Sequence, residues 1–218
     1  MNIKGKKIAF LGDSITSGVG TSSLKKVYWK VIERKTGAVC SGFGISGTRI
    51  AKQIVADPDA VHDRMHFITR IDKIDKNTDI IMVFGGVNDF AHGDAPLGKM
   101  SDRKDDTFYG ACHLLYERLV ESFPKADIFI ITPLHCAEED NRYNAVGFKS
   151  NIKLSDYVNI IVEVASYYSL AVLDLYKISG IKPSIKVHRE MFMPDGIHPN
   201  DAGNEKIANK IIAFLSSM

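Results

Sequence analysis

Two segments near opposite ends of the chain carry side chains that could together form an activated nucleophile. Ser14 closes a Gly-Asp-Ser turn directly after the first apolar run, and Asp195 and His198 lie three residues apart before the last helical segment. An imidazole can take the proton of a serine hydroxyl, and a carboxylate can fix the tautomer of that imidazole. These residue types predict a serine nucleophile, Ser14, with His198 as its base and Asp195 as the group that orients the base.

Two positions in the middle of the chain could supply hydrogen-bond donors to the same site. Gly44 lies in a glycine-rich run over residues 42–47, and Asn88 lies in a Gly-Gly-Val-Asn-Asp run. Both follow hydrophobic runs, so both could reach the same edge of a sheet. A backbone N–H at Gly44 and the amide of Asn88 are donors of the kind that stabilise a developing oxyanion.

The hydrophobic patterning predicts elements that alternate between strands and helices. Runs rich in Ile, Val and Phe are typical of buried parallel strands, at residues 7–11, 38–41, 79–84, 127–132 and 171–174. Helical spacing occurs near residues 24–36, 60–74, 107–123 and 152–168. A last helix carries an apolar stripe and is expected to be capped by Asn200 or Asp201; the stripe is Ile207, Ile211, Ile212 and Leu215.

This alternation predicts a single α/β domain over residues 1–218, a three-layer α/β/α architecture with a flavodoxin-like, five-stranded parallel sheet. Right-handed crossovers bring the carboxyl ends of the strands to one edge, where ligands bind in such sheets. Long loops at residues 90–106, 133–149 and 176–194 leave that edge and are expected to wall a pocket. Their apolar members are candidate substrate contacts, with local packing as the alternative: Phe90, Tyr143, Phe148, Met191, Phe192 and Met193.

The composition indicates an ordinary globular protein that works without nucleic acid. The chain has 218 residues, 45% of them hydrophobic, and a formal net charge of +2 with no basic stripe. Its three cysteines are widely spaced, which fits neither a disulfide framework nor a zinc site and favours free thiols in a reducing compartment. No segment approaches the roughly 20 apolar residues that span a bilayer, and the N-terminus enters a strand at once. We therefore expect a cytoplasmic protein.

Four sequence blocks, in order, resemble those of the SGNH hydrolases, the GDSL-type esterases and lipases. They are Gly-Asp-Ser-Ile at 12–15, Gly-Ile-Ser-Gly at 44–47, Gly-Val-Asn-Asp at 86–89 and Asp-Gly-Ile-His-Pro at 195–199. The resemblance implies an acyl-enzyme mechanism without metal or cofactor. It assigns the catalytic triad to Ser14, His198 and Asp195, and the oxyanion hole to the Ser14 N–H, Gly44 and Asn88.

The resemblance also guides expectations for the residues around the site. Glycine at 44 is expected to let a substrate approach its N–H without a Cβ in the way. The family usually carries Asn where this chain has Gly42, so a hydrogen bond that braces this loop is expected to be missing. Asp13, Phe90 and Phe192 are predicted to lie at the substrate, with Asp13 ordering its loop rather than reacting.

The leading functional prediction is a hydrolase of small-molecule carboxylic esters, with short acyl or acetyl groups on carbohydrates or small alcohols. A lysophospholipase or thioesterase of the same family is the first alternative. A non-catalytic, flavodoxin-like binding module is the second, although the chain has no phosphate-cradling glycine motif. A third is metal-dependent hydrolysis by Asp13, Asn88, Asp195 and His198, which would need more ligands than these blocks supply.

Overall fold

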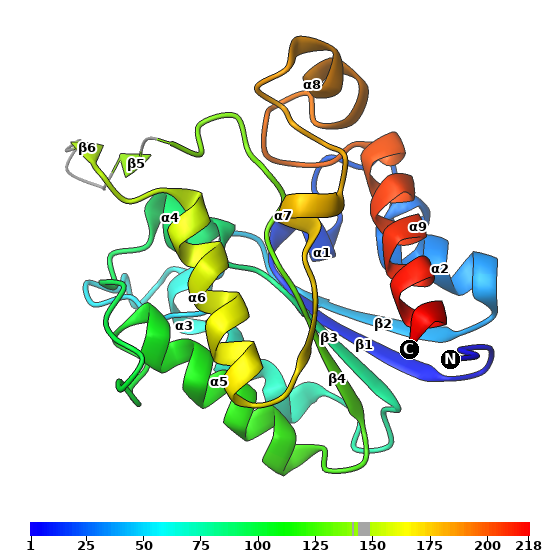
Figure 1. Cartoon of the computed structure of the whole chain (residues 1–218), viewed down its shortest axis with the longest axis horizontal. Coiled ribbons are helices and arrows are strands. Elements are labelled where there is room, and N and C mark those ends of the chain that lie inside the picture. Colours follow the sequence, from blue (N-terminus) through cyan, green and yellow to red (C-terminus); the bar gives the residue numbers. More distant parts are fainter. Residues whose placement is uncertain (141, 144–148) are drawn as a thin grey trace.

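The computed structural model describes residues 1–140, 142–143 and 149–218 and contains a five-stranded parallel sheet (Figure 1). Its strands are β1 (Lys7–Gly12), β2 (Val39–Gly44), β3 (Ile80–Phe84), β4 (Asp127–Ile131) and β7 (Ala171–Leu173), in the spatial order β2-β1-β3-β4-β7. Gly12 is level with Gly44 on one side and with Phe84 on the other. The carboxyl ends of the three strands that precede Ser14, Ile45 and Asn88 therefore lie at one edge.

Helices cover both faces of this sheet, which confirms the predicted three-layer fold. On one face Ala9, Leu11 and Val83 pack against the 3-10 helix η2 (Phe67–Lys73), α5 (Phe108–Ser122) and α6 (Leu154–Tyr167). On the other face Ile8 and Phe10 pack with α2 (Tyr28–Thr36) and α9 (Asp201–Ser217). Successive residues of a strand point to opposite faces, so strands with two apolar faces require this double covering. Figure 1 shows α2 and α9 on one side of the sheet and α5 and α6 on the other.

The ends of several helices are fixed by residues with the expected capping chemistry. Asn200 caps α9, because its side-chain oxygen accepts the N–H of Gly203 at 3.0 Å. Asp201 instead accepts hydrogen bonds from the backbone N–H and hydroxyl of Ser22, at 2.8 and 2.6 Å. Of the two predicted caps, Asn200 is therefore the one used. Asp201 ties the start of α9 to the segment after the first helix.

Two predicted helices differ from those in the structure. Residues 24–36 divide into the 3-10 turn η1 (Leu24–Lys26) and α2, because Val27 adopts an extended ψ of 141° between them. Residues 60–74 divide into α3 (Val61–Arg64) and η2, so the prediction of one continuous helix over these residues was wrong. Within the described ranges, no helix has both the length and the apolar character needed to cross a membrane.

Short elements occupy the loops at the carboxyl edge of the sheet. They are α1 (Ser14–Ser17), α4 (Val87–His92), the β5–β6 hairpin (Arg142–Tyr143 and Lys149–Ser150), α7 (Leu175–Ile178) and α8 (Lys186–Phe192). Figure 1 shows α8 at the top of the view and β5 and β6 at its upper left. The segments with candidate chemistry thus share one end of the molecule.

Candidate active site

Ser14 occupies a tight turn between β1 and the single-turn helix α1. Asp13 caps this helix, its carboxylate accepting the N–H of Ile15 at 3.0 Å. Gly18, with φ +94°, ends the helix in the left-handed region. The side chain of Ser14 is largely buried, and its Oγ lies 2.9 Å from Nε2 of His198. The first and last predicted segments therefore meet, although 184 residues separate the two side chains in sequence.

Asp195 fixes both the loop and the ring of His198. One carboxylate oxygen accepts the backbone N–H groups of Ile197 and His198 at 2.9 and 2.7 Å. The other lies 2.7 Å from Nδ1 of His198. Partial burial opposes ionisation of Asp195, but the backbone hydrogen bonds from His198 and Ile197, together with the ring of His198, outweigh it and lower the pKa of this carboxyl. An ionised carboxylate only accepts, so Nδ1 carries the ring proton and Nε2 is left to accept the Ser14 proton.

Close backbone packing holds the His198 loop against the segment after α1. Gly20 has φ +90°, and a Cβ there would lie 2.8 Å from the carbonyl oxygen of Pro199 and 3.0 Å from Cβ of His198. A larger residue at position 20 would therefore displace the imidazole from Ser14. This contact was not predicted, since only the folded chain brings Gly20 to the loop.

Gly44 lies beside α1, and the structure gives a different reason for glycine at this position from the one expected. A Cβ at Gly44 would lie 2.3 Å from the backbone nitrogen of Ser17 and 2.5 Å from the carbonyl carbon of Thr16. The glycine is thus required for packing against α1, whatever approaches its N–H. At Gly42 the space for a side chain is taken by Trp29, whose ring would lie 2.5 Å from a Cβ there. Trp29 donates its indole N–H to the carbonyl of Thr16 at 2.9 Å.

Asn88 lies in the first turn of α4 with both ends of its amide engaged. Its Nδ2 donates to the carbonyl oxygen of Thr48 at 2.9 Å, and its Oδ1 is 3.1 Å from Nε2 of His92. The sequence interpretation did not single out His92. The signal that could have found it is spacing, because residues four apart in a helix are neighbours on its surface. Reading residues 87–92 as a helix would have paired Asn88 with His92.

Buried ionisable groups tie the segment between Gly44 and Ala51 to the sheet. Arg70 donates from Nη1 to the carbonyl oxygens of Gly12 and Phe43 and from Nη2 to the hydroxyl of Thr48. The carboxylate of Asp89 accepts the N–H groups of Ile50 and Ala51 at 3.0 and 2.8 Å. Burial raises the pKa of Asp89, and likewise that of Asp13, to about 6. These groups set the position of the loop that carries Gly44.

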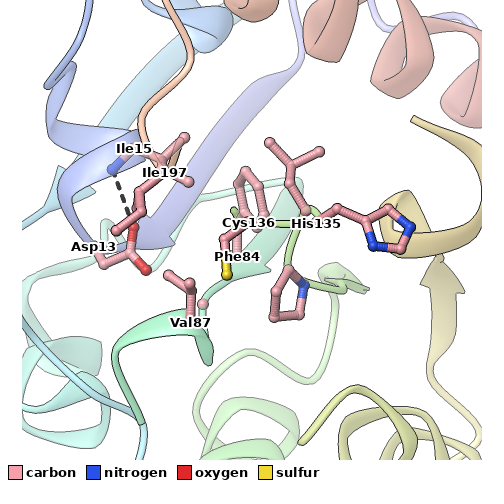
Figure 2. Close-up of a pocket in the computed structure, with 10 residues that line it drawn as sticks. Asp13, Ile15, Phe84, Val87, His135, Cys136 and Ile197 are labelled. Atoms are coloured by element: carbon pink, nitrogen blue, oxygen red, sulfur yellow. Dashed lines mark hydrogen bonds between the residues drawn. The ribbon is translucent and has the colours of Figure 1, made fainter. Parts of the chain in front are cut away.

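A small, largely apolar pocket opens between the turn at Ser14 and the start of the loop after β4 (Figure 2). Ile15 and Ile197, the neighbours of Ser14 and His198, contribute to its wall together with Val87 and Cys136. The remaining lining residues are Asp13, Phe84, Gly85, Pro133, Leu134 and His135. Figure 2 shows one oxygen of Asp13 bonded to the Ile15 nitrogen and the other facing the pocket. The pocket volume is about 10 Å³, close to the space that one water molecule needs.

The residues predicted to contact substrate lie in different surroundings in the structure. Asp13 lines the pocket, but Phe90 is only 3% exposed and packs in the core against Tyr157, at 6.1 Å between ring centroids. Phe90 therefore packs in the core and lies outside the described pocket. Phe192 does not line this pocket; it packs against His188 and Lys206.

The other predicted loop contacts have mixed outcomes. Met193 is buried in the core, and Met191 is exposed. The side chain of Tyr143 and the whole of Phe148 lie outside the described residues. Of the three long loops, only the one after β4 contributes to the described pocket, through residues 133–136.

Comparison with known proteins assigns the chain to a family. The sequence model of the GDSL-like lipase/acylhydrolase family matches residues 10–206, so the chain belongs to this family. A solved structure of a Lactobacillus plantarum protein is 30% identical, with a TM-score of 0.81 and 98% of each chain covered. None of the curated proteins compared with the chain matches it.

More distant solved structures share the fold. A lipase/acylhydrolase from Enterococcus faecalis is 19% identical, with a TM-score of 0.68 and 97% of this chain and 96% of that chain covered. An acetyl xylan esterase is 21% identical, with a TM-score of 0.63 and 95% of this chain and 98% of that chain covered. The predicted SGNH-type α/β fold is thereby confirmed.

Proposed function

We propose that the protein hydrolyses carboxylic esters through an acyl-enzyme formed on Ser14. The observation that carries this proposal is the continuous relay from the Ser14 hydroxyl to Nε2 of His198 at 2.9 Å, and from Nδ1 to Asp195 at 2.7 Å. Both separations are within hydrogen-bond reach, and the accepting carboxylate leaves Nε2 free of a proton. Membership of the acylhydrolase family supports the same reaction class.

The reaction begins with attack of Ser14 Oγ on the ester carbonyl carbon while His198 Nε2 takes the hydroxyl proton. The resulting imidazolium is stabilised by Asp195 and returns that proton to the departing alkoxide, which leaves as the alcohol. A water molecule then attacks the acyl-enzyme, with His198 again accepting and returning a proton. The products are a carboxylic acid and the free enzyme.

We assign three donors to the oxyanion of each tetrahedral intermediate. The N–H of Ser14 belongs to the first turn of α1, where N–H groups have no carbonyl one turn earlier to bond. Gly44 lies against the same turn, and Asn88 donates one amide proton to Thr48 and retains a second. The oxyanion hole therefore draws on the carboxyl ends of β1, β2 and β3.

The preferred substrates are acetyl or other short acyl esters of carbohydrates or small alcohols. The pocket beside Ser14 has a volume of about 10 Å³, so it has no room to bury a long acyl chain. A long chain therefore does not gain there the roughly 0.8 kcal/mol that burial of each methylene is worth. The acetyl xylan esterase among the structural neighbours supports this substrate class.

A lysophospholipase or thioesterase activity is the second candidate, favoured by apolar side chains that project beside the His198 loop. Ile185, Val187 and Met191, on and just before α8, are each about half exposed. They offer a surface to a long acyl chain that the small pocket does not. Hydrolysis rates of acetyl, butyryl and octanoyl esters separate the two. A kcat/KM at least tenfold higher for octanoyl would favour the second candidate.

Labelling with an active-site fluorophosphonate tests the reaction class. Wild type should take up one equivalent at Ser14, and Ser14→Ala should take up none, lose ester hydrolysis and keep its fold. Ser17→Ala is the matched control, because Ser17 lies on the same helix and its hydroxyl bonds Ser46 and the carbonyl of Ser14. Labelling of Ser14→Ala, or none of wild type, would refute the serine mechanism.

A further inference from the structure

A chain of hydrogen-bonded polar side chains runs from buried Asn88 through exposed His92 to buried Arg49 and Asp63. Oδ1 of Asn88 is 3.1 Å from Nε2 of His92, and Nδ1 of His92 is 2.9 Å from Nη2 of Arg49. Nη1 of Arg49 bonds Asp63 at 2.6 Å. The side chains of Arg49 and Asp63 are at most 7% exposed. The mechanism above uses only the first member of this chain.

The direction of every hydrogen bond in this chain follows from Arg49. A guanidinium has donors and no acceptor, so Nδ1 of His92 must accept from Nη2 and cannot carry a proton. The remaining ring proton is then on Nε2, which donates to Oδ1 of Asn88. Asp63 holds the guanidinium in place and also accepts the backbone N–H of Asp57 at 2.9 Å.

The neutral state of His92 is consistent with its surroundings. Partial desolvation of the ring against the protein, reinforced by the charge of Arg49, lowers the pKa of His92 to about 4. A protonated ring would set an N–H of Nδ1 directly against the Arg49 donor. His92 therefore remains a single-proton donor at neutral pH.

This donor determines which way the amide of Asn88 faces. If the amide rotated by half a turn, its NH₂ group would meet the Nε2–H of His92 and its oxygen would meet the carbonyl oxygen of Thr48. Both hydrogen bonds would become repulsive contacts of like groups. In the observed orientation one amide proton bonds Thr48 and the other is available.

We propose that His92, oriented by Arg49, is a positioning residue that holds the Asn88 amide with its second N–H toward the substrate oxyanion. This inference rests on the proposed function, because the oxyanion forms in ester hydrolysis. His92 itself touches no reacting atom. Its contribution is transmitted entirely through Asn88.

A double-mutant cycle tests the proposal. His92→Asn places an amide where Nδ1 was and leaves Asn88 without its donor, whereas His92→Gln returns an N–H near the position of Nε2. We expect His92→Asn to lower kcat about tenfold with KM changed less than about twofold, and His92→Gln to recover most of the loss. Asn88→Ala should lower kcat about 10²–10³-fold, and adding His92→Asn to it should lower kcat no further.

His113→Asn is the control for loss of a histidine ring outside this chain, because His113 is fully buried, unlike His92, and lies within hydrogen-bond distance of Tyr168. It should lower the Tm without changing kcat, which separates a loss of stability on removing a histidine ring from a positioning effect. An equal kcat loss from His92→Asn with and without Asn88, or an unchanged kcat in folded His92→Asn, would overturn the proposal.

The tautomer of His92 can be measured whether or not the protein cleaves esters. Ring nitrogen chemical shifts should show a proton on Nε2 and none on Nδ1 between pH 5.5 and 8. A proton on Nδ1 would overturn the proposed direction of the chain. Absence of both ester cleavage and Ser14 labelling would instead refute the proposed function and leave this result standing.

Discussion

Replacing Asp195 by Asn would reverse the direction of one hydrogen bond while keeping the loop. Both backbone N–H bonds, from Ile197 and His198, go to the same carboxylate oxygen, and the amide oxygen of Asn can accept both. The NH₂ group then faces Nδ1 of His198 and can only donate to it. The ring proton must move to Nε2, where it faces Ser14 as a donor, so the imidazole can no longer act as the base.

The size of the loss follows from this tautomer change and from the exposure of Asp195. In serine-protease triads the same Asp-to-Asn change lowers kcat by about 10⁴, equivalent to about 5.4 kcal/mol at 1.36 kcal/mol per tenfold. The side chain of Asp195 is 55% exposed, so water can partly replace the lost interaction. We therefore expect a loss of about 10³–10⁴ in kcat.

The assay is steady-state hydrolysis of a p-nitrophenyl acetate series, with thermal unfolding measured in parallel. Asp195→Asn should keep a Tm within a few degrees of wild type because its loop bonds remain, whereas Asp195→Ala should lose both the bonds and the activity. A near-wild-type kcat in the Asn variant would mean that another group orients His198. Equal Tm losses in both variants would refute the proposed bond geometry.

Three further outcomes are expected. Asn88→Ala should lower kcat about 10²–10³-fold with little change in KM, since its donor acts on the transition state; a rise in KM alone would place the oxyanion hole elsewhere. Burial raises the pKa of Asp13 from 3.8 to about 6, so the folded state binds the proton of this carboxyl more tightly than the unfolded state does. The free energy of unfolding therefore falls as the pH rises from 3.8 to about 6. The decline is about 3 kcal/mol, at 1.36 kcal/mol per pKa unit. Denaturant unfolding of Asp13→Asn between pH 3.5 and 7 should lack this share of the decline, and parallel curves for the two proteins would contradict it. Ester hydrolysis should survive chelator treatment; its loss would revive the metal-dependent alternative.

The strands were predictable because burial on both faces produces unbroken apolar runs, and the observed sheet uses all five. The end of β2 was harder to predict, because the sequence Gly42, Phe43 and Gly44 is typical of a turn. In the fold these residues pair in register with β1, from Phe10 to Gly12. The burial of Arg70 and its hydrogen bonds to two strand ends could not be predicted from the sequence. A helical pattern does not distinguish a solvated arginine from a buried one.

The element at the site that the sequence interpretation missed is α4. Residues 90–106 were interpreted as a loop from Phe90 onward, yet Val87–His92 form a helix. In a helix, positions three or four apart share a face. Val87 and Phe90 are both buried, and Asn88 and His92 are bonded to one another. One helical turn therefore places Phe90 in the core and brings His92 to Asn88, the proposed oxyanion donor. The motif predicts the reacting groups, but the periodicity of the element that carries them determines which neighbours hold them.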